Sequence, residues 1–127
     1  MKEMRRILII DDDDDIRQVA ALALETVEGW QVLMAGSGAD GICVAAREKP
    51  DAILLDVMMP DKDGPTTFKE LQENPETSGI PVLLLTAKVH AADQLRFSSL
   101  GVRTVLAKPF DPLTLGKQIA ECLGWKD

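Results

Sequence analysis

The sequence predicts an α/β fold in which five helices cover a parallel sheet of five strands. Apolar runs of strand length alternate with stretches of helical periodicity along the whole chain, which is the pattern of βαβ units. Three of these runs end directly in carboxylates or a hydroxyl, at the strand end where α/β sheets carry their binding sites. We expect strands at 5–10, 31–35, 51–55, 81–85 and 102–106, and helices at 14–27, 38–48, 65–73, 90–99 and 112–123.

The first three helices have clear apolar faces or end signals. The apolar face predicted for helix 14–27 consists of Ile16, Val19, Ala20, Ala23 and Val27. Ser37, with Asp40 three residues later, is typical of a helix start, and Pro65 suits the first turn of helix 65–73. The pairs Lys49-Pro50 and Asn74-Pro75 end the second and third helices, because the residue before a proline avoids the α region.

The last two helices differ in the strength of their patterns. In helix 90–99 the apolar residues Ala92, Leu95, Phe97 and Leu100 form no continuous stripe. In helix 112–123 Asp111 is predicted to be the N-cap and Pro112 to occupy the first helical position. The predicted apolar face of this helix consists of Leu115, Ile119, Cys122 and Leu123.

Composition limits the class of protein. We expect 127 residues to form a single domain (1–127) with its core at about 5–123. The net charge of −7 argues against direct binding to nucleic acid. Cys43 and Cys122 are predicted to be small buried hydrophobes in a reducing compartment. Neither a signal peptide nor a membrane-spanning helix can be drawn, so a cytoplasmic location without membrane insertion is expected.

Polar residues follow four of the expected strands. Asp56 closes the run 52–55, the aspartates 11–15 follow the run 6–10, Thr86 follows 82–85, and Lys108 follows the apolar segment 102–107. Because the carboxyl ends of parallel strands meet at one edge, these side chains should converge. As isolated residues they would be interpreted as solvated loop acids and a surface lysine.

The run of five aspartates is predicted to serve two purposes. Asp11 and Asp12 lie at the strand end and are candidates for function, while residues 13–15 cap the first helix and favour its dipole. Two like charges at ~4 Å cost about 4 kcal/mol at an effective dielectric of ~20, so Asp11, Asp12 and Asp56 together need a cation. Oxygen ligands without histidine or cysteine favour Mg²⁺ over a larger Ca²⁺ cage.

The remaining groups suit phosphoryl chemistry. An ammonium at Lys108, a hydroxyl at Thr86 and a metal ion around one carboxylate can compensate the charge on the oxygens of a transferred phosphoryl group. Asp56 can act there as the nucleophile and become an acyl phosphate.

Four segments in order resemble the receiver domain of two-component response regulators: residues 7–12 (ILIIDD), 54–64 (LLDVMMPDKDG), 84–87 (LLTA) and 108–110 (KPF). The resemblance covers about residues 5–123. It implies a doubly wound, flavodoxin-like (βα)5 three-layer sandwich with strand order 2-1-3-4-5.

The resemblance also implies roles for the site residues. Asp56 would accept the phosphoryl group from a phosphohistidine on a histidine kinase or phosphotransfer protein. Asp12, Asp56 and the Met58 carbonyl would hold Mg²⁺ directly, and Asp11 would do so through water. Thr86 and Lys108 would bind the phosphoryl oxygens, and the Lys108-Pro109 bond would be cis.

A downstream protein, which the sequence does not identify, would bind the face of helix four, strand five and helix five. The protein would then be a stand-alone signalling module that catalyses its own phosphorylation and slow dephosphorylation, and not a turnover enzyme. Met58 and Lys88, each two residues after a site residue, would flank the path of attacking water. One departure concerns Val105, which stands where the family usually has the Tyr or Phe that swings inward on activation.

Three other readings compete with this one. A Mg²⁺-dependent aspartyl phosphohydrolase needs a second acid two residues after the nucleophile, where this chain has Met58. A flavodoxin-type cofactor module needs a glycine- and hydroxyl-rich loop after the first strand, where five aspartates would repel phosphate. A degenerate receiver is disfavoured by the intact set of acids, hydroxyl and lysine.

Overall fold

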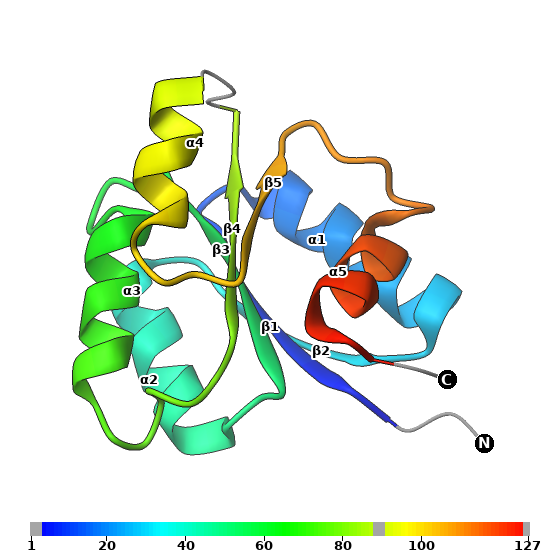
Figure 1. Ribbon diagram of the computed structural model, residues 1–127. Coiled ribbons are helices and arrows are strands. Elements are labelled where there is room, and N and C mark those ends of the chain that lie inside the picture. Colours follow the sequence, from blue (N-terminus) through cyan, green and yellow to red (C-terminus); the bar gives the residue numbers. More distant parts are fainter. Residues whose placement is uncertain (1–3, 88–90, 126–127) are drawn as a thin grey trace.

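The computed structural model describes residues 4–87 and 91–125 and shows a parallel sheet at the centre of the molecule (Figure 1). Within these residues the sheet has five strands in the order β2-β1-β3-β4-β5, as the resemblance to receiver domains implied. The strands are β1 Arg6–Ile10, β2 Gln31–Ala35, β3 Ala52–Asp56, β4 Val82–Thr86 and β5 Thr104–Ala107.

Helices cover both faces of the sheet, so the fold has three layers (Figure 1). On one face lie α1 (Asp14–Ala23) and α5 (Leu115–Leu123). On the other lie α2 (Gly38–Glu48), α3 (Gly64–Glu73) and α4 (Ala91–Ser98). A strand buried on both faces places successive residues in opposite layers. Accordingly, Ile7 and Ile9 belong to the core beneath α1 and α5, and Leu8 and Ile10 to the core beneath α2 and α3.

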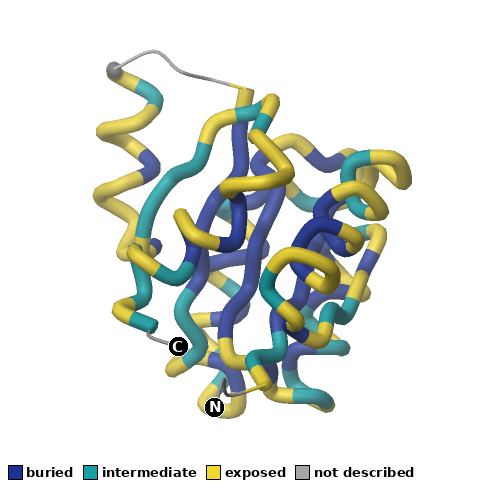
Figure 2. The backbone as a smooth tube through the Cα atoms, turned by 90° about the vertical axis from the view of Figure 1, so that its right-hand side faces the viewer, coloured by how far each residue is buried: buried dark blue, intermediate teal, exposed yellow. Residues whose placement is uncertain are grey.

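The burial pattern explains why the central strands end at fixed positions. Every residue of β3 and β4 is buried, and Figure 2 shows that buried residues lie at the centre of the molecule and exposed residues around it. Complete burial of one such leucine or isoleucine stabilises the fold by about 1.5–3 kcal/mol. The strands therefore cannot slip without losing this burial, and their last residues, Asp56 and Thr86, are held at one edge of the sheet.

Several end signals predicted from the sequence are confirmed. The Asp13 carboxylate accepts hydrogen bonds from the N–H groups of Asp15 and Ile16 and so caps α1. The Ser37 hydroxyl caps α2 through Asp40 N–H. α2 gives way to the C-cap Lys49, and α3 to the C-cap Asn74, each directly before a proline.

The first helix differs from the prediction of one helix over 14–27. Regular α-helix ends at Ala23, and a π-helical turn, η1, covers Leu24–Glu28 up to Gly29, which adopts φ 75°. The wider turn rotates its residues relative to an α-helix, and Val27 is exposed instead of buried. Val19 was also predicted to be buried, but it borders a surface groove and is 46% exposed.

The prediction for the last helix is wrong at its start. α5 begins at Leu115 with Thr114 as its N-cap, and residues 112–114 form a turn. Asp111 instead stands directly before this turn. Its carboxylate accepts a hydrogen bond from Leu113 N–H, and its carbonyl accepts hydrogen bonds from the N–H groups of Thr114 and Leu115. Asp111 therefore acts as a capping residue one turn earlier than the regular helix.

Two further predictions about burial need correction. Cys43 is exposed, because the buried face of α2 is formed by Gly38, Gly41 and Ala45 and position 43 points away from it. Cys122 is half-buried. In α4, whose expected first residue 90 lies outside the described residues, Phe97 is buried whereas Leu95 is 74% exposed.

No helix within the described ranges is both long and apolar enough to cross a membrane.

Candidate functional site

The predicted site residues do converge at the carboxyl edge of the sheet. Asp56 is the last residue of β3, Thr86 the last of β4, and Asp11 and Lys108 follow β1 and β5. The carboxylates of Asp11, Asp12 and Asp56 each place an oxygen within 4.8 Å of the others. Asp11, Asp56 and Thr86 are buried, with exposed fractions of 1%, 3% and 1%, whereas Asp12 is exposed.

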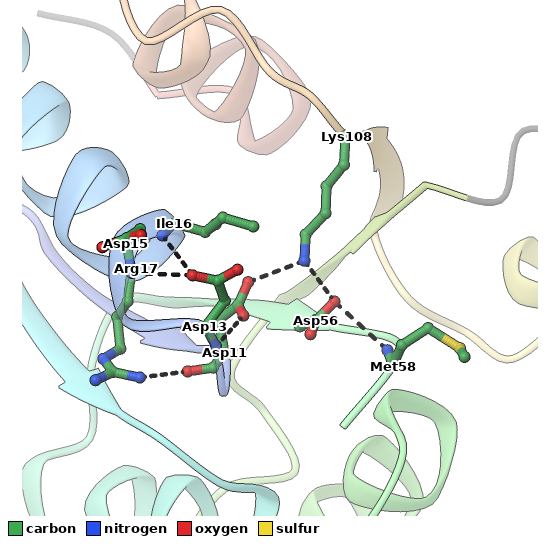
Figure 3. A network of polar contacts seen from close by, with 8 residues as sticks. All are labelled: Asp11, Asp13, Asp15, Ile16, Arg17, Asp56, Met58 and Lys108. Atoms are coloured by element: carbon green, nitrogen blue, oxygen red, sulfur yellow. Dashed lines mark hydrogen bonds and ion pairs between the residues drawn. The ribbon is translucent and has the colours of Figure 1, made fainter. Parts of the chain in front are cut away.

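Lys108 links the two buried acids (Figure 3). Its Nζ donates to Asp56 Oδ1 at 2.8 Å and lies 3.1 Å from Asp11 Oδ2. The main chain of Lys108 is anchored as well, because its N–H donates to the Thr86 carbonyl at 2.8 Å. The following bond to Pro109 is cis, as expected. The Lys108 ammonium therefore reaches the carboxylates of Asp56 and Asp11 from the end of β5.

The surroundings of Asp56 favour its neutral form more than water does. Burial raises the pKa of this carboxyl, and the negative charge of Asp11 raises it further. The hydrogen bonds from Lys108 and from the Met58 N–H, which lies 3.4 Å from Oδ1, act in the opposite direction. The net result is a pKa of about 6, so the carboxylate predominates at neutral pH.

Lys108 keeps its charge in this position. Burial lowers the pKa of its ammonium, but the contacts with Asp56 and Asp11 outweigh burial and raise the pKa above its ordinary value. Its side chain is 17% exposed. A permanently charged ammonium is thus held beside the Asp56 carboxylate, which suits binding of an anionic group at that carboxylate.

The aspartates of the loop between β1 and α1 have different contacts, as Figure 3 shows for Asp11 and Asp13. The Asp11 Oδ1 accepts from Asp13 N–H at 2.9 Å, which directs the other oxygen toward Lys108. Asp13 is the N-cap of α1, and Asp14 and Asp15 lie in its first turn. Asp11 and Asp12 therefore belong to the site, and the following three aspartates start the helix.

The residues present fit a hard divalent cation. Asp11 Oδ2 is buried, and within the described part of the chain its partner is the Lys108 ammonium, with which it forms an ion pair at 3.1 Å. Among the residues that the structure describes, the three clustered carboxylates lie beside one ammonium, that of Lys108, which leaves excess negative charge. An all-oxygen donor set of this kind matches Mg²⁺ chemistry.

Other residues named from the sequence lie around this centre. Met58, two residues after Asp56, is 60% exposed. Val105 is half-buried and packs against the core beneath α2 and α3. Lys88 lies outside the described residues.

Two features near the site were not predicted from the sequence. The Arg17 guanidinium donates from Nη1 to the Asp11 carbonyl at 2.6 Å and pairs through Nη2 with Asp14. The spacing of Asp14 and Arg17 on one helix signals the ion pair, but nothing in the sequence signals the bond to Asp11. The second feature is a mostly apolar cavity of about 380 Å³ beside Lys108, lined also by Asp15, Ile16, Val19, Ala87, Pro109 and Phe110.

The structure thus combines a parallel sheet of order β2-β1-β3-β4-β5 with acids, a hydroxyl and a lysine at one sheet edge. Residues 7–120 match the response regulator receiver domain, and the chain belongs to this family. Receiver domains are the signalling modules of two-component response regulators, so the comparison supports a role in phosphoryl-transfer signalling.

Individual relatives place the chain within that family. PilH of Pseudomonas aeruginosa is 40% identical over 116 residues, which cover 91% of this chain and 95% of PilH. The probable transcriptional regulatory protein TcrX of Mycobacterium tuberculosis is 39% identical over 105 residues, which cover 82% of this chain and 43% of TcrX. The structure of the chemotaxis protein CheY4 of Vibrio cholerae superimposes with a TM-score of 0.87 at 28% identity, covering 94% of this chain and 99% of CheY4.

Proposed function

We propose that Asp56 accepts a phosphoryl group from a phosphohistidine on a histidine kinase or a phosphotransfer protein. The observation that carries this proposal is the buried Asp56 carboxylate, held by Lys108 and clustered with Asp11 and Asp12. Within this proposal residues 1–127 act as one receiver unit.

The chemistry follows from the protonation state of Asp56. A carboxyl with a pKa of about 6 is mostly ionised at neutral pH and can act as a nucleophile. One of its oxygens forms the new bond to phosphorus, while the phosphorus–nitrogen bond breaks and its electron pair stays on the imidazole. Lys108 and the Thr86 hydroxyl compensate the charge on the phosphoryl oxygens.

We further propose that the reaction depends on Mg²⁺. Asp12, Asp56 and the Met58 carbonyl would hold the ion directly, and Asp11 would hold it through water. When bound, the ion compensates the negative charge of the clustered carboxylates and of the incoming phosphoryl group. This assignment is supported by the cluster of three carboxylates, of which Asp11 and Asp56 are buried, beside the single Lys108 ammonium among the described residues.

The apolar cavity beside Lys108 supports a protein as the donor. It lies between α1 and the segment 108–110 and borders a second groove that includes the exposed side chains of Leu22 and Leu113. Exposed apolar surface next to a reactive group suits docking of a protein helix that carries the phosphohistidine. Because this chain carries a net charge of −7, it is poorly suited to binding nucleic acid.

For the output, we propose that phosphorylation changes the face formed by α4, β5 and α5, where an unidentified downstream protein binds. The exposed Leu95 on α4 is suited to such a contact. In the family, a Tyr or Phe usually stands at the position of Val105 and swings inward on activation. Val105 has a β-branched side chain with restricted rotamers and cannot make this large movement.

The two cysteines, both free, fit a reducing cytoplasm.

The decisive experiment is incubation with acetyl phosphate and Mg²⁺, followed by intact-mass measurement. We expect the parent protein to gain one phosphoryl group, and Asp56→Asn to gain none. Asp63→Asn is the matched control, because Asp63 caps α3 from the same loop and asparagine caps equally well. A phosphoryl group retained by Asp56→Asn, or an unmodified parent protein, would contradict the proposal.

A further inference from the structure

We propose that Arg17 is a positioning residue for divalent metal binding, because it fixes the main chain between the two aspartates at the end of β1. This inference rests on the proposed function, in which Asp11 and Asp12 help to hold Mg²⁺. Arg17 itself contacts neither Asp56 nor Lys108 in the network of Figure 3, so its influence passes through Asp11.

The guanidinium of Arg17 makes two directed contacts. Nη1 donates to the Asp11 carbonyl at 2.6 Å, and Nη2 pairs with the Asp14 carboxylate one helical turn earlier. The side chain is only 16% exposed, although Arg17 lies in the second turn of a surface helix. A planar fork that makes two bonds is held in one orientation, which a flexible ammonium cannot reproduce.

The position of the Asp11 carbonyl affects both aspartates at the end of β1. It belongs to the peptide plane that continues into Asp12, so fixing this carbonyl also fixes where Asp12 begins. On the other side, the Asp11 N–H donates to the Ala35 carbonyl at 3.1 Å. The main chain of Asp11 is thus held at both ends, by the neighbouring strand and by Arg17.

Gly36, the residue after Ala35, leaves room for the Arg17 guanidinium. A Cβ atom at Gly36 would lie 3.3 Å from Arg17 Nη1, closer than an ordinary contact. The guanidinium therefore lies between the loop after β1 and the loop after β2. This packing holds it at the site even though Asp14 is largely exposed.

Charge and positioning predict opposite effects on metal affinity. A positive charge near the acids repels a dication, so its removal should tighten Mg²⁺ binding if charge alone mattered. The exposed Asp14 offsets part of that charge through the ion pair. The groups that orient metal ligands typically change affinity by about 10–100-fold. We therefore expect the loss of positioning to dominate.

The test compares Arg17→Met, which keeps side-chain length but removes the charge and the fork, with Arg17→Lys, which keeps the charge but not the fork. Calorimetric titration with Mg²⁺ should give a dissociation constant about tenfold higher for Arg17→Met and several-fold higher for Arg17→Lys. Arg47→Met is the matched control, since it removes the same charge from an exposed ion pair on α2 and should leave the constant unchanged.

Several outcomes separate this inference from the proposed function. No Mg²⁺ binding by the parent protein contradicts both. Normal binding by the parent, with unchanged or tighter binding by the variants, contradicts the positioning role alone. Titrations are run below the melting temperature of each variant, and a lowered melting temperature with an unchanged dissociation constant would show a purely structural role. If Arg17→Met does not fold, Arg17→Lys decides the question.

Discussion

Asp56→Asn should stabilise the metal-free protein, although it should also abolish phosphorylation. Asparagine resembles the protonated carboxyl in shape and charge, so the variant approximates the protein with Asp56 permanently neutral. In the parent protein the ionised carboxylate lies 3% exposed beside Asp11, and burial is the main reason for its raised pKa. The substitution removes the unfavourable charge and leaves Lys108 its contact with Asp11.

The magnitude follows from the pKa. A rise from 3.8 to about 6 means that folding disfavours the ionised carboxyl, by about 3 kcal/mol at 1.36 kcal/mol per pH unit. Because the folded-state pKa is the higher one, this penalty is absent below about pH 4. It grows as the pH rises from 4 to 6 and is complete above about pH 7. We expect Asp56→Asn to be more stable by about 1–3 kcal/mol at pH 7.5 and equal to the parent at pH 3.5.

The assay is urea unfolding of both proteins in EDTA at a series of pH values. Trp30 and Trp125 provide the signal, since their rings pack edge to face with centroids 5.3 Å apart. Trp30 precedes β2, at the end of the sheet opposite the site, so the signal reports unfolding and not the substitution itself. Excess Mg²⁺ should reduce or reverse the difference, because the parent keeps all three acids.

Two results would refute this reasoning. A stability difference that does not change between pH 4 and pH 7.5 would show that ionisation of Asp56 is not its source. A clear loss of stability in Asp56→Asn at pH 7.5 would show that the carboxylate stabilises the fold and that the acids are not crowded. The control Asp63→Asn should follow the parent at every pH, because its cap is retained.

Three further predictions concern metal binding, phosphorylation and the lifetime of the product. Asp12→Ala should weaken Mg²⁺ binding strongly and Asp14→Ala hardly at all, since only Asp12 belongs to the carboxylate cluster; equal losses in a Mg²⁺ titration would contradict this division. Lys108→Ala should keep Mg²⁺ binding but slow phosphorylation by acetyl phosphate. An unchanged rate would contradict a role for Lys108 in phosphorylation. Met58→Asn should shorten the phosphorylated lifetime in excess Mg²⁺, because the long apolar side chain of the exposed Met58 would shield an acyl phosphate on Asp56 and cannot orient a water; an equal or longer lifetime would reject shielding.

The sheet and the place of the site could be predicted because both depend on local patterns. The fully apolar runs that became β3 and β4 are of strand length and are bounded by turn residues, which favours strands buried on both faces, and parallel strands end at one edge. Asp56 and Thr86 therefore had a predictable position. The Asp13 cap and the breaks at Lys49 and Asn74 were visible for the same reason, since each depends on residues adjacent in the sequence.

The errors arose where tertiary packing decides the outcome. Helical periodicity placed Val19 on the buried face of α1, but the segment after β5 stands off from that position and leaves a groove. The π-helical turn after Ala23 changed the direction of Val27, and no residue type marks such a turn. Cys43 looked buried because it is apolar, although the small residues around it form the face that packs.

Arg17 shows a further kind of limit, because its proposed role depends on a main-chain atom. A search of the sequence for ligands finds side chains such as those of Asp11 and Asp12, but the bond that holds them is made to a carbonyl six residues away. Judged by charge alone, an arginine near an acidic metal site should be an impediment to cation binding. Judged by its contacts, it orders the loop that carries the acids. The sign of the change in Mg²⁺ affinity on removing Arg17 therefore follows from geometry, and the composition of the site predicts the opposite sign.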